Sequence, residues 1–331
     1  MAELTKMIRV SIGELEDQLG VQKWPLYARA CEQVFQDRIG RIAGRIAAEP
    51  EIRAVFVSGP TASGKTTFAD RLAQALYSAG RRTRLISLDD YYKTGDILFD
   101  SQGRPDYESI DTLETDHMVS DFAALLAGRT VQLPTFDFVQ RRQIVLPEKK
   151  IVLDDGDLIL VEGLHGLSGL VAGHLPRRQI LGIFIMPWCT LLDGRQLLGS
   201  RDLRILRRIS RDVLHRGSTA LSTLDYWPMI DQTEQQFFPP YLARADEYVN
   251  SCLPYEFCVV APLAAAQIRA SLEQYELGWL PGSIYRNNQQ GYADLPSAVE
   301  EARDLLKACR RIPVADTGIV PEQSILREFI E

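Results

Sequence analysis

Residues 54–67, AVFVSGPTASGKTT, decide the fold of this 331-residue chain. The run begins with AVFVSG, whose apolar and β-branched residues are typical of a parallel strand that is covered on both faces. Residues 59–66 match the pattern G-x-x-x-x-G-K-[ST] in full, and a helix is predicted from about Thr66 to Ala79, ending at Gly80. A strand, a glycine-rich turn and a helix in this order predict a phosphate-binding loop (P-loop) for a nucleoside triphosphate.

Each part of the P-loop has an expected chemical task. The glycines let backbone N–H groups turn toward phosphate oxygens, and the helix N-terminus adds a positive dipole. Lys65 is expected to reach the β- and γ-phosphates, and the hydroxyl of Thr66 to ligate Mg²⁺. The predicted cofactor-binding residues are therefore Gly59, Pro60, Thr61, Ala62, Ser63, Gly64, Lys65, Thr66 and Thr67.

Strands and helices alternate along the rest of the chain. Helices are predicted at 27–48, at 116–126 and in the tail from about Leu263. Further strands are predicted at 157–161, 180–186 and, shorter, 256–260, and residues 82–90 are predicted as a strand followed by an acidic loop. This alternation predicts an α/β fold, a P-loop NTPase three-layer sandwich with a mainly parallel sheet and helical segments at both ends. The expected division is an N-terminal helical segment (1–50), a P-loop domain with an arginine-rich lid near 201–218 (51–262) and a C-terminal helical extension (263–331).

Composition excludes several classes of protein. Hydrophobic residues make up 46% and charged residues 24%, and the net charge of −7 provides no general basic field for nucleic acid or an anionic membrane. The five cysteines form no CxxC pair, which fits reduced thiols. The first 20 residues carry acids where a signal peptide needs an apolar core, and the longest apolar run is far shorter than the ~20 residues of a membrane span. We expect a cytoplasmic protein.

Carboxylates follow two predicted strands and so reach the same edge of the sheet as the P-loop. One group lies in SLDDYY (87–92), where an Asp can accept the proton of an attacking hydroxyl, although adjacent Asp residues also cap helices or close turns. The other is Glu162, at the end of the strand predicted at 157–161, which lies either near the metal or at the surface.

Residues 201–216, RDLRILRRISRDVLHR, hold six arginines in this acidic chain. On a helical wheel one arc contains Arg201, Arg204, Arg207, Arg208 and Arg211, and outside it lie Leu203, Leu206, Ile209, Val213 and Leu214. Such an arc is either a solvated face or, because guanidinium groups suit phosphoryl oxygens, a lid over phosphates. Beside a P-loop we favour the lid. The four histidines show no metal-ligand spacing and receive no role.

These pieces, in this order, resemble the uridine kinase/phosphoribulokinase family of P-loop kinases. The matching blocks, within about residues 54–260, are GPTASGKTTF, SLDDYY, LPTFDF, VEGLHGL, RRISRDVLHRG and ARADEYVNS. DYESI, DLRILRRISRD and a tail ending in SILREFI are similar to the kinase part of long bacterial uridine-kinase-like proteins that carry a TGS domain ahead of it. Only some 50 residues precede the P-loop strand here, so we expect no TGS portion.

The resemblance implies a kinase that uses ATP and Mg²⁺ to phosphorylate a hydroxyl of a small molecule. It implies catalytic roles for Asp89 (as base), Lys65, Arg208 and Arg211, and Mg²⁺ ligation by Thr66, Asp89 and Glu162. It implies a substrate site formed by Asp89, Tyr92, Glu108, Phe136, Arg141 and Arg208. The expected partner is the small-molecule acceptor, with no nucleic acid and no membrane, and a homo-oligomer remains open.

The acceptor side departs from the family pattern at several positions. Glu108 aligns with a family Asp that binds ribose hydroxyls, and Phe136 and Arg141 align with a Tyr and a His near the base; Ser218 replaces a third family arginine. A Phe donates no hydrogen bond, and an Arg brings a charge that a neutral pyrimidine does not require. Three hypotheses follow: a nucleoside kinase acting on a uridine- or cytidine-like acceptor, a kinase of a sugar phosphate or other anionic hydroxyl compound, and a nucleotide-binding regulatory protein without acceptor turnover.

Overall fold

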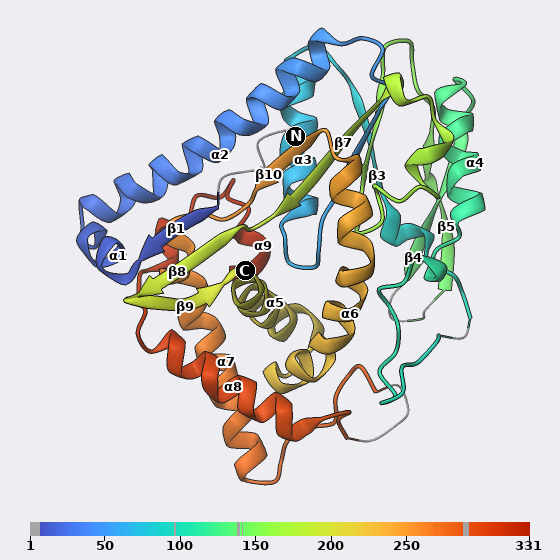
Figure 1. Ribbon diagram of the computed structural model, residues 1–331. Coiled ribbons are helices and arrows are strands. Elements are labelled where there is room, and N and C mark those ends of the chain that lie inside the picture. Colours follow the sequence, from blue (N-terminus) through green and yellow to red (C-terminus); the bar gives the residue numbers. More distant parts are fainter. Residues whose placement is uncertain (1–6, 96, 138–139, 141, 287–290) are drawn as a thin grey trace.

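The computed structural model describes residues 7–95, 97–137, 140, 142–286 and 291–331. Its centre is a sheet whose described strands follow the order β10-β7-β2-β6-β3 (Figure 1), and every neighbouring pair is parallel. The strand bounds are β2 (Ala54–Ser58), β3 (Thr83–Ser87), β6 (Leu158–Glu162), β7 (Ile180–Met186) and β10 (Glu247–Asn250). The predicted α/β fold with a parallel sheet is confirmed.

Helices cover the sheet and extend beyond its carboxyl edge (Figure 1). Their bounds are α1 (Ile12–Gln18), α2 (Lys23–Ala48), α3 (Lys65–Ser78), α4 (Thr115–Leu126), α5 (Ser200–Arg216), α6 (Ala220–Arg244), α7 (Phe257–Glu276), α8 (Leu295–Cys309) and α9 (Arg327–Ile330). Two smaller sheets accompany the central one. The first joins β1 (Ile8–Ser11), β8 (Cys189–Asp193) and β9 (Arg195–Gly199), and the second is an antiparallel ribbon of β4 (Val131–Asp137) and β5 (Arg142–Ile151).

Alternate residues of the central strands are buried on opposite faces of the sheet. Val55 and Val57 of β2 belong to the apolar core shared with α2 and α3, whereas Ala54 and Phe56 belong to the core shared with α4. Both faces are therefore covered, which explains why every residue of β2 is buried and why residues 54–57 are all apolar rather than alternately apolar. The result is the expected three-layer sandwich.

The N-terminal segment is helical over most of its described length, but not at Ile8–Ser11. This stretch forms β1, which pairs in parallel with β8 through Ile8 and Cys189. The prediction of a helical segment is wrong there, because the strand depends on a partner far away in the sequence. α2 confirms the helix predicted at 27–48 and begins slightly earlier, at Lys23.

The short strand predicted at 256–260 is also wrong. Phe257 begins α7, and the strand at that edge of the sheet is β10, which pairs with β7. A short apolar run looks the same in a buried helix and in a strand, so periodicity alone could not separate them. The carboxylate of Glu256 accepts a hydrogen bond from the N–H of Leu253 (2.8 Å) and thereby stabilises the helical turn that leads into α7.

The C-terminal part packs under the carboxyl edge of the sheet, with α5 enclosed by α6, α7 and α9 (Figure 1). α7 runs without interruption through residues 262 and 263, so the division expected there stays a prediction. In the part of the chain that the structure describes, no helix has both the length and the apolar character needed to cross a bilayer.

Candidate active site

The P-loop connects β2 with α3 at the carboxyl edge of the sheet. Ala62 (φ 55°) and Gly64 (φ 83°) both adopt the left-handed conformation, which turns successive N–H groups toward the concave side of the loop. Gly59 has no room for a side chain, since a Cβ there would lie 2.1 Å from the carbonyl oxygen of Ile185. The first glycine of the motif is thus required by backbone packing.

Two arginines of α5 hold the P-loop from outside. Arg204 Nε donates to the carbonyl oxygen of Thr61 (2.9 Å), and Arg207 Nη1 donates to that of Ala62 (3.2 Å). Because a trans peptide points its C=O and the following N–H in opposite directions, these contacts turn the next two N–H groups away from α5. The arginines therefore help to present the loop N–H groups to an anion.

Three of the five arginines of the predicted arc are buried rather than solvated, whereas the side chain of Arg201 is 40% exposed. Arg204, Arg207 and Arg208 are at most 4% exposed, and so are the apolar residues Leu203, Leu206 and Ile209. Buried carboxylates compensate the charges: the pairs are Arg204–Glu234, Arg207–Glu256 and Arg208–Asp212. The solvated-face alternative is wrong, because two of these acids come from segments that helical spacing could not connect to α5. The lid interpretation stays a prediction.

Two polar groups of the P-loop suit a phosphate. Lys65 Nζ donates to the carbonyl oxygen of Pro60, within its own loop (2.9 Å). The hydroxyl of Ser63 is buried and has no hydrogen-bond partner among the described residues. Buried polar groups nearly always have one, and a phosphate oxygen in the loop would supply it. These residues therefore fit a nucleotide.

Asp89 and Glu162 lie together next to the P-loop. Asp89 is in the short 3₁₀ helix Leu88–Tyr91 after β3, and Glu162 ends β6. The hydroxyl of Ser87 links them, donating to Glu162 Oε1 (2.7 Å) and accepting from the N–H of Asp89 (3.4 Å). Burial and the negative charge of Asp89 raise the pKa of Glu162 to about 7, against the lowering effect of Lys65.

This carboxylate pair fits Mg²⁺ bound together with a nucleotide. Mg²⁺ is usually held by one or two carboxylates plus substrate phosphates rather than by an all-protein cage. The described residues contain no group of three His, Cys, Asp or Glu side chains arranged for a metal ion. Thr66 is exposed at the start of α3, and Glu162 is buried beside Lys65. The hydroxyl of Thr66 and the carboxylate of Glu162 therefore both fit the Mg²⁺ ligation expected of them.

Asp90 has a different set of contacts from Asp89. Its carboxylate pairs with Lys149 of β5 (2.7 Å) and accepts a hydrogen bond from the N–H of Phe136 in β4 (3.3 Å). Asp90 therefore anchors the β4–β5 ribbon, whereas Asp89 lies close enough to Glu162 to raise its pKa. This difference in contacts favours Asp89 over Asp90 as the base that would accept the proton of an acceptor hydroxyl.

The expected acceptor residues meet the P-loop through Arg208. Its Nη1 donates to Thr61 Oγ1 (3.0 Å) and lies 3.8 Å from Glu108 Oε1. Burial raises the pKa of Glu108, while the positive charges of Arg208 and Lys65 lower it. Tyr92 packs against Phe136 with ring centroids 5.5 Å apart. The prediction for Arg141 falls outside the described residues.

His165 is a site residue that the sequence analysis missed. Its Nε2 lies 2.8 Å from the carbonyl oxygen of Glu108, and its Nδ1 lies 2.7 Å from the hydroxyl of Tyr241. Since a carbonyl only accepts, Nε2 carries the proton and Nδ1 accepts from the tyrosine. Burial lowers the pKa of His165 to about 4. Its place in VEGLHGL, three residues after Glu162, was an available signal.

Two further residues come from the C-terminal part of the chain: Tyr285 lies outside every matching block, and Glu328 lies in SILREFI, where it was given no role. The hydroxyl of Tyr285 accepts from Arg208 Nη2 (2.9 Å) and donates to Asp212 Oδ2 (3.1 Å), so it helps to hold the arginine. Glu328 contacts Arg211, whose Nη1 lies 3.5 Å from Glu328 Oε1. Arg211 also pairs with Asp212 (2.9 Å).

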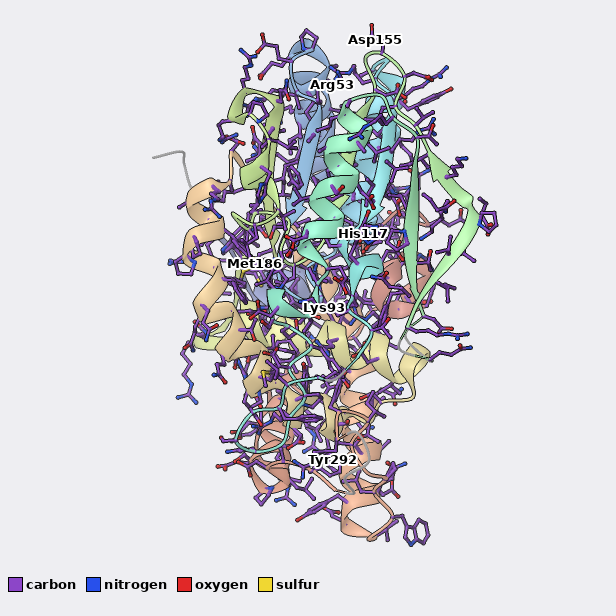
Figure 2. All side chains as sticks on the ribbon, turned by 90° about the vertical axis from the view of Figure 1, so that its right-hand side faces the viewer. Arg53, Lys93, His117, Asp155, Met186 and Tyr292 are labelled. Atoms are coloured by element: carbon purple, nitrogen blue, oxygen red, sulfur yellow. The ribbon has the colours of Figure 1, made fainter. Side chains whose placement is uncertain are left out.

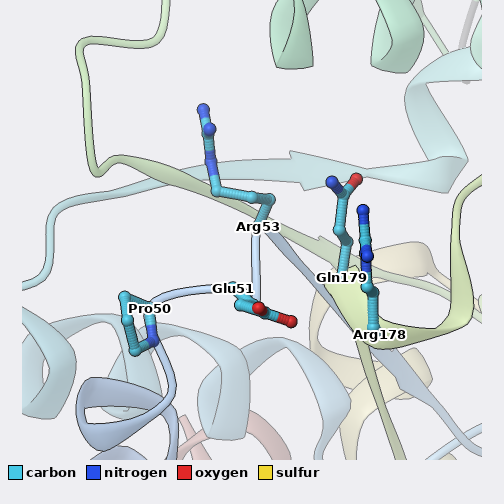
Figure 3. A pocket seen from close by; sticks show the side chains of 5 residues that line it. All are labelled: Pro50, Glu51, Arg53, Arg178 and Gln179. Atoms are coloured by element: carbon cyan, nitrogen blue, oxygen red, sulfur yellow. The ribbon is translucent and has the colours of Figure 1, made fainter.

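Two hollows lie near the two ends of the sheet. A cavity of about 260 Å³ is at the amino end of β2, opposite to the P-loop, and is lined by Pro50, Glu51, Arg53, Arg178 and Gln179 (Figure 3). A smaller hollow of about 70 Å³ lies on the acceptor side and includes Tyr92, Lys93, Tyr107 and Ser109. Figure 2 shows this separation, with Arg53 and Asp155 at one end of the sheet and Lys93 toward the other. The smaller hollow therefore adjoins the candidate active site, and the larger cavity does not.

Comparisons with known proteins agree with this geometry. The family model described as Phosphoribulokinase / Uridine kinase family matches residues 54–254. The uridine kinase of Halobacterium salinarum is 28% identical over 195 residues, which cover 58% of this chain and 77% of that protein. The uridine kinase of Macrococcus caseolyticus is 29% identical over 194 residues, covering 58% and 84%.

Among solved structures, one described as a possible uridine kinase from Bacillus stearothermophilus aligns with a TM-score of 0.43 and 19% identity. The alignment covers 64% of this chain and 97% of that one. The family match spans the P-loop, Asp89, Glu162 and Arg208 together. This chain therefore belongs to the phosphoribulokinase/uridine kinase family and is a phosphotransferase that acts on a hydroxyl group.

Proposed function

We propose that this chain transfers the γ-phosphate of ATP, bound with Mg²⁺, to a hydroxyl of a nucleoside. The observation that carries the proposal is the shared neighbourhood of four groups beside the P-loop. The charges of Lys65 and Asp89 act on both Glu162 and Glu108. A phosphate-binding cation, a base, a metal-type carboxylate and an acceptor-side carboxylate thus lie within electrostatic reach of one another.

In this proposal each side chain has one task. Lys65 and the loop N–H groups hold the β- and γ-phosphates, and Mg²⁺, when bound, neutralises charge on them. Asp89 accepts the proton of the acceptor hydroxyl as its oxygen bonds to the γ-phosphorus and the bond from that phosphorus to the bridging oxygen of ADP breaks. Arg208, fixed by Thr61 and Tyr285, neutralises charge on the transferred group.

The choice of a nucleoside acceptor is supported by the relatives in Halobacterium salinarum and Macrococcus caseolyticus, both named uridine kinase. On the acceptor side, a partly buried carboxylate (Glu108) can accept hydrogen bonds from hydroxyls, and the rings of Tyr92 and Phe136 offer a flat apolar surface. Phe136 cannot donate a hydrogen bond to a base, so we expect weak discrimination among nucleobases.

The experiment is a phosphate-transfer screen with MgATP and purified protein. The acceptors are uridine, cytidine, purine nucleosides, sugar phosphates and polyols, and kcat/KM is measured for each. The proposal expects nucleosides to give the highest values, with uridine and cytidine close to each other. A sugar phosphate as best substrate would replace the nucleoside by an anionic acceptor. Binding of MgATP without transfer to any acceptor would instead indicate a regulatory protein.

A further inference from the structure

Residues 324–330, which we call the tail segment, pack directly against the P-loop. In Figure 1 the C-terminus lies in the middle of the molecule, next to α9 and above α5. The side chain of Ile325 is fully buried and faces Gly64, where a Cβ would lie 3.5 Å from Ile325 Cδ1. Phe329 is also fully buried, with its ring centre 4.9 Å from Cζ of Arg207. Two apolar anchors therefore hold the tail segment at the loop.

Between these anchors, Glu328 makes two polar contacts with residues of the candidate site. Its Oε2 accepts a hydrogen bond from Thr67 Oγ1 (3.2 Å), across 261 positions of sequence. Its Oε1 lies 3.5 Å from Nη1 of Arg211. The Glu328 side chain is 23% exposed, so the ion pair is only partly screened by water. A carboxylate thus occupies one donor in the first turn of α3, Thr67, and one on α5, Arg211.

These donors are also suited to a phosphate. Thr67 is the third residue of α3, so it lies in the first turn, where the helix dipole and unpaired N–H groups favour an anion. The described hydrogen bond and ion pair of Glu328 go to Thr67 and Arg211, and its negative charge also raises the pKa of Glu162. A phosphate group and a carboxylate cannot both occupy the same hydroxyl and guanidinium without repulsion between their negative charges.

We propose that Glu328 competes with a phosphate group of the bound nucleotide for Thr67 and Arg211, and so lowers the affinity of the site for nucleotides. The inference rests on the proposed function of the P-loop and adds that the Glu328 carboxylate weakens nucleotide binding there. Rotation of the Glu328 side chain is enough to release both donors; Ile325 and Phe329 then keep the tail segment at the loop, but with two fewer contacts to hold it.

The test compares Glu328→Gln with the wild-type chain by calorimetric titration with MgADP, MgATP and adenosine at low salt. Glutamine keeps the size of the side chain and removes its charge. We expect Kd for MgADP and MgATP to fall about 10-fold, the scale of one charge-assisted hydrogen bond, and Kd for adenosine to stay unchanged. The matched control is Glu322→Gln, an exposed acid just before the tail segment, which should leave all three values unchanged.

The outcomes separate this inference from the proposed function. If neither the wild-type chain nor Glu328→Gln binds MgADP, the competition and the proposed function are both wrong. If only the variant binds MgADP, the competition and the proposed function are both supported. Unchanged or weaker binding of MgADP by Glu328→Gln would overturn the competition alone, because it would make Glu328 indifferent to the nucleotide or part of its site. An equal gain for adenosine would also overturn it, since adenosine carries no phosphate.

A second measurement uses the wild-type chain and does not depend on a variant. Displacement of Glu328 removes contacts that hold the tail segment on α3, so its backbone amides should exchange hydrogen faster when MgADP is bound. Slower exchange at 324–330 would show that the nucleotide tightens the segment, and the competition would then be wrong.

Discussion

Arg207 and Glu256 form a buried ion pair in which two parallel hydrogen bonds join the guanidinium to the carboxylate. Nε lies 2.7 Å from Oε2 and Nη2 lies 2.9 Å from Oε1, and neither side chain is exposed to solvent. The same guanidinium donates to the carbonyl oxygen of Ala62 in the P-loop. The pair therefore connects the start of α7 to the phosphate-binding loop.

The first prediction is that Glu256→Gln strongly destabilises the fold. It leaves the charge of Arg207 buried without its counter-charge, which costs about 3–5 kcal/mol of the free energy of unfolding. Denaturant titration measures this loss. The matched control is Glu247→Gln, because Glu247 pairs with Arg38 at a partly exposed site and its loss should cost about 1 kcal/mol or less. Equal effects of the two substitutions would contradict the importance of burial.

The second prediction concerns Lys65→Ala. The ammonium group contacts only the carbonyl oxygen of Pro60 among the described hydrogen bonds, so its removal should change the melting temperature little. Turnover with MgATP should fall below detection, because the β- and γ-phosphates lose their cation. A variant that unfolds, or one that keeps its activity, would refute the assignment of Lys65.

The third prediction compares Asp89→Asn with Asp90→Asn. Removing the base should lower kcat by about 10²–10⁴ with little change in the affinity for ATP. Asp90→Asn breaks the ion pair with Lys149 and should mainly loosen the β4–β5 ribbon, seen as faster hydrogen exchange there. If the larger loss of kcat followed Asp90→Asn, the two roles would have to be exchanged.

The fourth prediction is that Tyr285→Phe lowers kcat by about 10- to 100-fold while KM for ATP stays within a few-fold. The phenyl ring can keep the stacking on Tyr226 (centroids 4.2 Å apart), but Arg208 and Asp212 lose the shared hydroxyl. Loss of one such hydrogen bond to a charged group corresponds to about 1.5–3 kcal/mol. Steady-state kinetics give the split between kcat and KM, and an unchanged kcat would mean that Arg208 needs no support from Tyr285.

The fifth prediction is a loss of stability in acid that depends on His165. Burial lowers its pKa to about 4 from an ordinary 6.5, so the unfolded chain takes up a proton first as the pH falls. Stability should therefore decrease as the pH falls from about 6.5 to about 4, by up to about 3 kcal/mol. Denaturant titrations at several pH values measure it.

His165→Gln should remove this component of the pH dependence, whereas His174→Asn at an exposed position should leave it in place. The same acid dependence in His165→Gln as in the wild-type chain would assign the effect to another group.

The sequence by itself determined the P-loop and the carboxylates that lie beside it. The P-loop could be predicted because its strand, turn and helix are consecutive, and each conformation depends on residues within a few positions. Gly64 shows this directly, since the left-handed turn before α3 needs the residue that the motif specifies. Asp89 and Glu162 could be placed at the same edge because parallel strands end there.

The tertiary structure alone decided the partners of these residues. The arginines of α5 were visible as one helical arc, but their burial depends on carboxylates such as Glu234 and Glu256, which lie 30 and 49 positions away. Ile8–Ser11 became a strand only because β8 is beside it. Glu328 reached Thr67 from the other end of the chain. Local spacing determines helices and turns, whereas burial and charge compensation between distant segments depend on how the whole chain packs.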